Sequence, residues 1–261
     1  MNENAIVDPE WVEERLDAVL IVDVRDKWEY ENIGHLPRAV SIPFDAFRSK
    51  SGPTGMLPPL DDWIQLMESS GISHDDRLVA YDDTHGVFSA RFLMTALLLG
   101  HEGTLHLLNG DFTSWSRSHE VTMERPDHNP SSYNIEPPST TPLIAADEVL
   151  EALEGNSTVI DTRSPQEYAT GHLPGSINLD WREFVDEASR GLKPKSEIEN
   201  ILHGHNISRD DHVILYCNTA RRISHTFFVL KWLGFESVRF YEGSLSEWKE
   251  RGLTIIDEDN A

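Results

Sequence analysis

The sequence predicts an α/β protein made of two tandem domains, each a mostly parallel sheet flanked by helices. Short apolar runs alternate along the chain with longer segments of helical character, which is typical of parallel strands joined by crossover helices. The same order of motifs occurs twice, with offsets of 133 to 138 residues between the two copies. A repeat of this length indicates a duplicated domain, because solenoid units are far shorter.

The first copy contains three expected helices and four expected strands. A helix is expected over residues 9–16, and the apolar residues 19–24 predict the first strand. A GHLP turn at residues 34–37 precedes a second short strand around residues 40–42. The copy continues with a helix over 61–70 that ends at Gly71, a strand at 78–82, a helix over 89–99 that stops at Gly100, and a strand at 105–108.

The second copy repeats this layout, with GHLP at residues 171–174 and VILYC at 213–217 in the place of LVAYD at 78–82. The helix after VILYC ends at Gly234, as its counterpart ends at Gly100. Between the copies, residues 119–142 carry five prolines and little apolar periodicity, as expected of an interdomain connector. We therefore expect domains at residues 1–118 and 143–261, joined by a connector at 119–142.

The single cysteine of the chain, Cys217, stands at the end of an expected strand and at the entrance of a helix. Ligands of parallel sheets bind at the carboxyl ends of strands, and a helix start offers unpaired N–H groups and the positive end of its dipole. Arg221 and Arg222 add positive charge beside the thiol, so a lowered thiol pKa is expected. The alternative is a buried, inert cysteine.

Composition excludes several other classes of protein. The net charge of −23 argues against nucleic acid as a partner, because the phosphates would be repelled. No run of about 18 apolar residues is present, so no membrane contact is expected. The N-terminus lacks the basic and apolar regions of a signal peptide, and a cytoplasmic location is the expectation. One cysteine permits no internal disulfide, and the His and Cys spacing does not suit a zinc site.

The ordered set of D-x-R, GHLP, strand-YC-loop-helix and G-x-x-x-x-W motifs, present in both halves apart from the cysteine, resembles the tandem rhodanese family. These proteins are sulfurtransferases that act on thiosulfate or 3-mercaptopyruvate. The resemblance covers nearly the whole chain. In this family the second domain usually carries the active cysteine and the first has lost it. Asp82 stands where Cys217 stands in the second copy, which implies that the first domain is catalytically inactive.

The resemblance also implies a mechanism that needs no metal or organic cofactor. The Cys217 thiolate attacks the outer sulfur of the donor and becomes a persulfide, which cyanide, a thiol or a thioredoxin-like dithiol then removes. Arg163 matches the family's substrate-binding arginine; its alternative is an ion pair with Glu167, four residues on. The residues expected to cradle the persulfide through their backbone N–H groups are Asn218, Thr219, Ala220, Arg221 and Arg222.

Three features of the loop bear on the donor and the reaction. Only four residues separate Cys217 from Arg222, whereas related phosphatase loops have five, so the loop suits sulfur better than phosphate. Ala220 stands where the family usually has glycine, and a positive φ there would strain the loop. Arg221 and Arg222 favour a doubly charged donor, hence thiosulfate. The alternatives are that the donor is 3-mercaptopyruvate, or that the protein is a non-catalytic sulfur carrier that binds a protein partner.

A monomer is expected, because the duplication supplies a pseudo-dimer.

Overall fold

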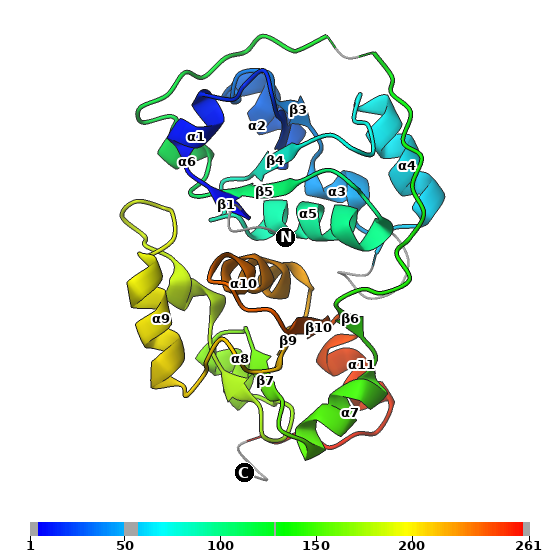
Figure 1. Cartoon of the computed structure of the whole chain (residues 1–261), viewed down its shortest axis with the longest axis vertical. Coiled ribbons are helices and arrows are strands. Elements are labelled where there is room, and N and C mark those ends of the chain that lie inside the picture. The colour runs from blue at the N-terminus through cyan, green and yellow to red at the C-terminus, as the bar shows by residue number, and fades with distance from the viewer. Residues whose placement is uncertain (1–4, 50–56, 128, 258–261) are drawn as a thin grey trace. The chain divides into compact units, whose positions relative to one another are not determined.

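The computed structural model describes residues 5–49, 57–127 and 129–257, and it divides into two compact units. Of the described residues, the first unit comprises 5–49, 57–127, 129–140 and 186–192, and the second comprises 141–185 and 193–257. Each unit contains a five-stranded sheet in which every strand pair is parallel, which confirms the predicted fold class (Figure 1). All five strands of each unit are short, so the sheets rely on buried apolar side chains for their stability.

In the first unit the strand order is β1-β5-β4-β2-β3. The strands are β1 (Ile6–Val7), β2 (Leu20–Asp23), β3 (Val40–Ser41), β4 (Leu78–Tyr81) and β5 (Leu105–Leu108). The helices are α1 (Pro9–Glu13), α2 (Lys27–Asn32), α3 (Phe44–Phe47), α4 (Leu60–Ser69), α5 (Val87–Leu99) and α6 (Phe112–Trp115). Helix α5 is buried on nearly all sides and ends at Gly100, whose φ of +101° is the left-handed cap that the sequence predicts.

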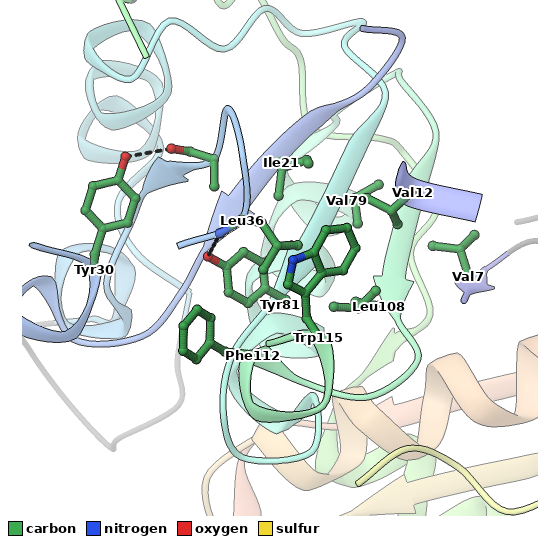
Figure 2. Close-up of a cluster of buried hydrophobic side chains, with 11 residues drawn as sticks. Val7, Val12, Ile21, Tyr30, Leu36, Val79, Tyr81, Leu108, Phe112 and Trp115 are labelled. Atoms are coloured by element: carbon green, nitrogen blue, oxygen red, sulfur yellow. Dashed lines mark hydrogen bonds between the residues drawn. The ribbon is translucent and has the colours of Figure 1, made fainter. Parts of the chain in front are cut away.

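Side chains from the sheet and from α1 and α6 form one of the apolar clusters of this unit (Figure 2). Two hydroxyl groups reach into it: Tyr30 donates to the carbonyl of Ala39 at 2.7 Å, and Tyr81 accepts from the N–H of Leu36 at 3.2 Å. Buried tyrosines usually find such partners, because an unpaired buried hydroxyl is costly. The cluster therefore ties the GHLP turn, which contains Leu36, to the central strand β4.

In the second unit the strand order is β6-β10-β9-β7-β8, which repeats the topology of the first. The strands are β6 (Leu143–Ile144), β7 (Thr158–Asp161), β8 (Ile177–Asn178), β9 (Val213–Tyr216) and β10 (Val238–Tyr241). The helices are α7 (Ala146–Glu154), α8 (Pro165–Ala169), the 3₁₀ turn η1 (Trp181–Phe184), α9 (Lys195–Gly204), α10 (Arg221–Trp232) and α11 (Ser244–Glu250). The matching topology agrees with the duplication inferred from the sequence.

The expected strands and the three expected helices of the first copy are all present, with shifts at their ends. Helix α1 ends at Glu13 rather than at residue 16, and α5 begins two residues before residue 89. The sequence reasoning missed β1 and β6, which are edge strands of two residues each. Two residues are too few to show a period of two, so only the pairing with β5 and β10 reveals them.

The proline-rich segment 119–142 contains no helix or strand in its described part, which leaves out residue 128. It nevertheless contacts the first unit closely. Thr122 forms an isolated bridge with His35, and the N–H of Tyr133 donates to the Glu68 carboxylate at 3.2 Å. Only 1% of Tyr133 is exposed. Residues 119–127 and 129–140 therefore pack as part of the first unit. Among the described residues, no helix combines the length and the apolar character that crossing a membrane requires.

Candidate active site

Cys217 is the first residue after β9, the central strand of the second sheet. Three loop residues follow it, and α10 begins at Arg221. The cysteine is 2% exposed, and the N–H of Thr219 donates to its sulfur at 3.4 Å. The first N–H groups of a helix have no partner within the helix, so this loop presents donors to an anion held at Cys217. The geometry agrees with the strand, loop and helix that the sequence predicts.

The first unit contains the same loop with an anion already in it. Asp82 follows β4, and its carboxylate accepts from the backbone N–H groups of Thr84, Gly86, Phe88 and Ser89 at 2.7 to 2.9 Å. Burial raises the pKa of Asp82, while these backbone bonds act in the opposite direction. The residue 135 positions after Thr84 is Thr219, which donates to Cys217. A loop of this shape can therefore surround a buried anion with backbone donors.

Ala220 has a φ of +57° and precedes the first residue of α10. Its counterpart His85 has a φ of +56°, so the left-handed conformation belongs to the loop in both units. Any residue other than glycine is strained in this conformation, because its Cβ approaches the following carbonyl oxygen. The expected strain at Ala220 is thus present.

Replacing Ala220 by glycine should raise the free energy of unfolding by about 0.5–1 kcal/mol, because the left-handed strain exceeds the extra chain entropy of glycine. Urea unfolding of both proteins measures this difference. Replacing Ala152, which lies inside α7, by glycine is the control and should destabilise by a similar amount. A loss of stability in Ala220→Gly would contradict the assignment of strain to this position.

Arg222 is held by Glu167 of helix α8. Its two Nη atoms donate to the two carboxylate oxygens at 2.5 and 3.0 Å. This hydrogen bonding to Arg222 lowers the pKa of Glu167. The side-chain amide of Asn218 also reaches the same carboxylate, at 3.5 Å. One of the two arginines expected to attract a dianion is therefore neutralised in part by a carboxylate of the protein itself.

Arg221 and Arg222 both lie within electrostatic reach of Cys217. Burial lowers the pKa of Arg221, and the charge of Cys217 opposes this effect. The Nε of Arg221 lies 3.4 Å from the hydroxyl of Thr219. Within residues 5–49, 57–127 and 129–257, no group of three or more His, Cys, Asp and Glu side chains is arranged to hold a metal ion.

Arg163 is buried and pairs with Asp161 at the end of β7. Its Nε and Nη2 donate to the Asp161 carboxylate at 2.5 to 3.0 Å, and Nη2 also donates to the carbonyl of Gly171 at 2.7 Å. Arg25 makes the same contacts in the first unit, with Asp23 and the carbonyl of Gly34. The alternative, a surface ion pair between Arg163 and Glu167, is wrong, because Arg163 is buried and pairs with Asp161, whereas Glu167 pairs with Arg222. A contact between Arg163 and substrate stays a prediction.

Glu167 is the residue at this site to which sequence reasoning gave no role of its own. The sequence feature that singles out Glu167 is its position three residues after Ser164, with which it forms a capping box at the start of α8. That pattern explains a helix cap but says nothing of a partner beyond the helix. Arg222 is 55 residues away in sequence, so this ion pair becomes visible only in the folded chain, where β7 and β9 pair and the helices that follow them begin at the same edge of the sheet.

Two parallel α/β domains, one of which carries a cysteine between its central strand and the following helix, define a duplicated protein with one thiol site. Residues 8–118 and 145–251 both match the family model for the rhodanese-like domain. The chain belongs to the rhodanese family. The recognition made from the motifs is thereby confirmed.

Curated relatives align over nearly the full length of the chain. It is 31% identical over 272 residues to a thiosulfate sulfurtransferase of Pseudomonas aeruginosa, covering 97% of this chain and 96% of the relative. It is 30% identical over 268 residues to the sulfur carrier protein TtuD of Thermus thermophilus, covering 93% of each. Both alignments therefore span the two matched domains of this chain.

Solved structures agree on the fold. SseA of Escherichia coli, described as a 3-mercaptopyruvate sulfotransferase, superposes with a TM-score of 0.80 at 24% identity and covers 92% of this chain and 98% of its own. A variant of EanB in complex with hercynine gives a TM-score of 0.86 at 18% identity, over 97% of this chain and 70% of its own. At these identities the likeness concerns the fold alone.

Proposed function

We propose that this protein is a sulfurtransferase that moves a sulfane sulfur from thiosulfate to cyanide or a thiol through a persulfide on Cys217. The proposed catalytic residue is Cys217, and the first domain, with Asp82 in the matching place, is inactive. The proposed domains are residues 1–118 and 143–261, with 119–142 as the connector, and the protein acts as a monomer without a cofactor. The proposed substrate-binding residues are Arg163, Asn218, Thr219, Ala220, Arg221 and Arg222.

The chemistry takes place at one sulfur atom. The Cys217 thiolate attacks the outer sulfur of thiosulfate, the S–S bond of the donor breaks, and sulfite leaves with the bonding electron pair. Cyanide then attacks the terminal sulfur of the persulfide, thiocyanate leaves, and the thiolate is restored. Each state of Cys217 is an anion or a polarised sulfur that backbone N–H groups stabilise.

One observation carries this proposal: Cys217 occupies the loop position at which the first unit surrounds a carboxylate with four backbone N–H groups. A site that can hold a buried anion can hold a thiolate and a persulfide. The name of the Pseudomonas aeruginosa relative supports thiosulfate as the donor.

The donor is tested by comparing kcat/KM for thiosulfate and for 3-mercaptopyruvate, with cyanide as the acceptor. We expect turnover with both and a higher kcat/KM with thiosulfate. A reversed preference would keep the mechanism and overturn the donor. Mass spectrometry after incubation with donor alone should show the mass gain of one sulfur atom.

A sulfur-carrier function is the second candidate, and two observations favour it. Ala220 is strained in the loop, and the relative from Thermus thermophilus is named a sulfur carrier protein. A carrier would form the persulfide on Cys217 but release its sulfur to cyanide slowly, since release to a protein partner is its task. A stable persulfide with no thiocyanate formed would establish this second function.

A further inference from the structure

We propose that Glu167 is a positioning residue that holds Arg222 beside Cys217 and sets the charge that an anionic sulfur donor meets. The inference deepens the proposed function, and the expected effect of Glu167 on sulfur donors rests on that function. The expected effect of Glu167 on the charge at Cys217 is independent of the proposed function. Glu167 is not itself placed against the reacting sulfur; it acts through Arg222.

The contact geometry gives Arg222 a fixed direction. Two Nη atoms facing two carboxylate oxygens form a bidentate pair, which restricts both the position and the plane of the guanidinium. The pair is only partly exposed, with side-chain exposures of 21% for Arg222 and 36% for Glu167. Glu167 is fixed in turn, because its carboxylate accepts from the N–H and hydroxyl of Ser164 at 3.3 and 3.2 Å.

The duplication separates this function from helix capping. Glu29 occupies the equivalent place on α2, where it forms the same kind of capping box with Asp26. The residue at the position of Arg222 in the first unit is Val87, so no arginine faces Glu29 from there. Burial and the neighbouring Asp83 raise the pKa of Glu29, whereas Arg222 lowers that of Glu167. Among the residues that the structure describes, the capping glutamate therefore has such an arginine partner in the unit that carries the cysteine, and Glu29 does not.

Glu167 sets part of the charge that an anion meets at Cys217. Arg221 and Arg222 contribute two positive charges and Glu167 one negative charge, while Asp161 and Arg163 form a buried pair that is neutral as a whole. Glu167 therefore offsets the charge of Arg222, one of the two arginines of the loop. Loss of the Glu167 charge makes the surroundings of Cys217 more positive by one unit, which favours a dianion such as thiosulfate over a monoanion such as 3-mercaptopyruvate.

The test measures charge at Cys217 without any sulfur transfer. Cys217 is the only cysteine, so its alkylation rate is read from the whole protein. The rates with anionic iodoacetate and neutral iodoacetamide are compared at one pH. Both reagents react with the same thiolate, so the fraction of ionised Cys217 cancels in the ratio of the two rates. Glu167→Gln should raise the ratio of iodoacetate to iodoacetamide rates about two- to fivefold at low ionic strength, and added salt should reduce the effect.

Two variants control for other causes. Glu199→Gln breaks an ion pair with Arg209 elsewhere in the second unit and makes the same change in net charge. It should leave the ratio unchanged. Glu167→Asp keeps the charge and should stay closer to the wild type than Glu167→Gln. An unchanged ratio in Glu167→Gln, or an equal shift in Glu199→Gln, would overturn the proposal.

The donor readout completes the experiment. Glu167→Gln should lower the KM for thiosulfate more than the KM for 3-mercaptopyruvate, with circular dichroism confirming the fold. A shifted alkylation ratio in a protein that transfers no sulfur would overturn the proposed function and keep the role of Glu167. An active enzyme with an unshifted ratio would do the reverse.

Discussion

Replacing Cys217 by alanine should abolish sulfur transfer, with kcat/KM for thiosulfate falling at least about a thousandfold. The reason is that the persulfide forms on this sulfur, and the chain has no second cysteine to replace it. No mass gain of one sulfur atom should appear after incubation with thiosulfate. Rates of thiocyanate formation, measured for both proteins at equal concentration, check the prediction.

The control for this loss is stability. Cys217 is buried but small, so its replacement by alanine should leave the unfolding midpoint close to that of the wild type. Loss of transfer in a folded variant then belongs to the chemistry. Residual thiocyanate formation above a tenth of the wild-type rate would contradict a persulfide on Cys217, and it would direct attention away from this loop.

Replacing Arg163 by methionine should lower the free energy of unfolding of the second unit by about 3–5 kcal/mol, as expected when one partner of a buried ion pair is removed. The side chains of Arg163 and Asp161 are 3% and 0% exposed, so the carboxylate left behind has little access to water. The carbonyl of Gly171 would also lose its donor. Urea unfolding at neutral pH measures the effect.

Arg25→Met is the matched control in the first unit, where Arg25 and Asp23 are 1% and 0% exposed. It should destabilise by a similar amount. The pair of variants also tests the substrate contact of Arg163. A KM for thiosulfate that rises in Arg163→Met and not in Arg25→Met, measured where both remain folded, would support that contact. Equal KM values would assign Arg163 to structure, and a loss below about 1 kcal/mol would contradict the importance of the buried pair.

Much of the fold could be predicted because its signals are local. A buried parallel strand is a short apolar run whatever its neighbours are, as Val213 to Leu215 illustrate. Gly100 marks a helix end because few other residues adopt its positive φ. The duplication doubled this evidence, and it showed Asp82 in the place of Cys217. The position of Cys217 at a strand end could likewise be predicted from the apolar residues directly before it.

The partners of the charged side chains were decided by the tertiary structure. Arg222 meets Glu167 across 55 residues of sequence because α8 follows β7 and α10 follows β9, and these strands pair in parallel, so both helices begin at the same edge of the sheet. No pattern within either helix specifies that contact. Arg163 donates to the Asp161 carboxylate and the Gly171 carbonyl rather than to Glu167, since a buried guanidinium needs several acceptors at once. Residue types near a site follow from sequence, whereas the charge left for a substrate depends on which side chains already neutralise each other in space.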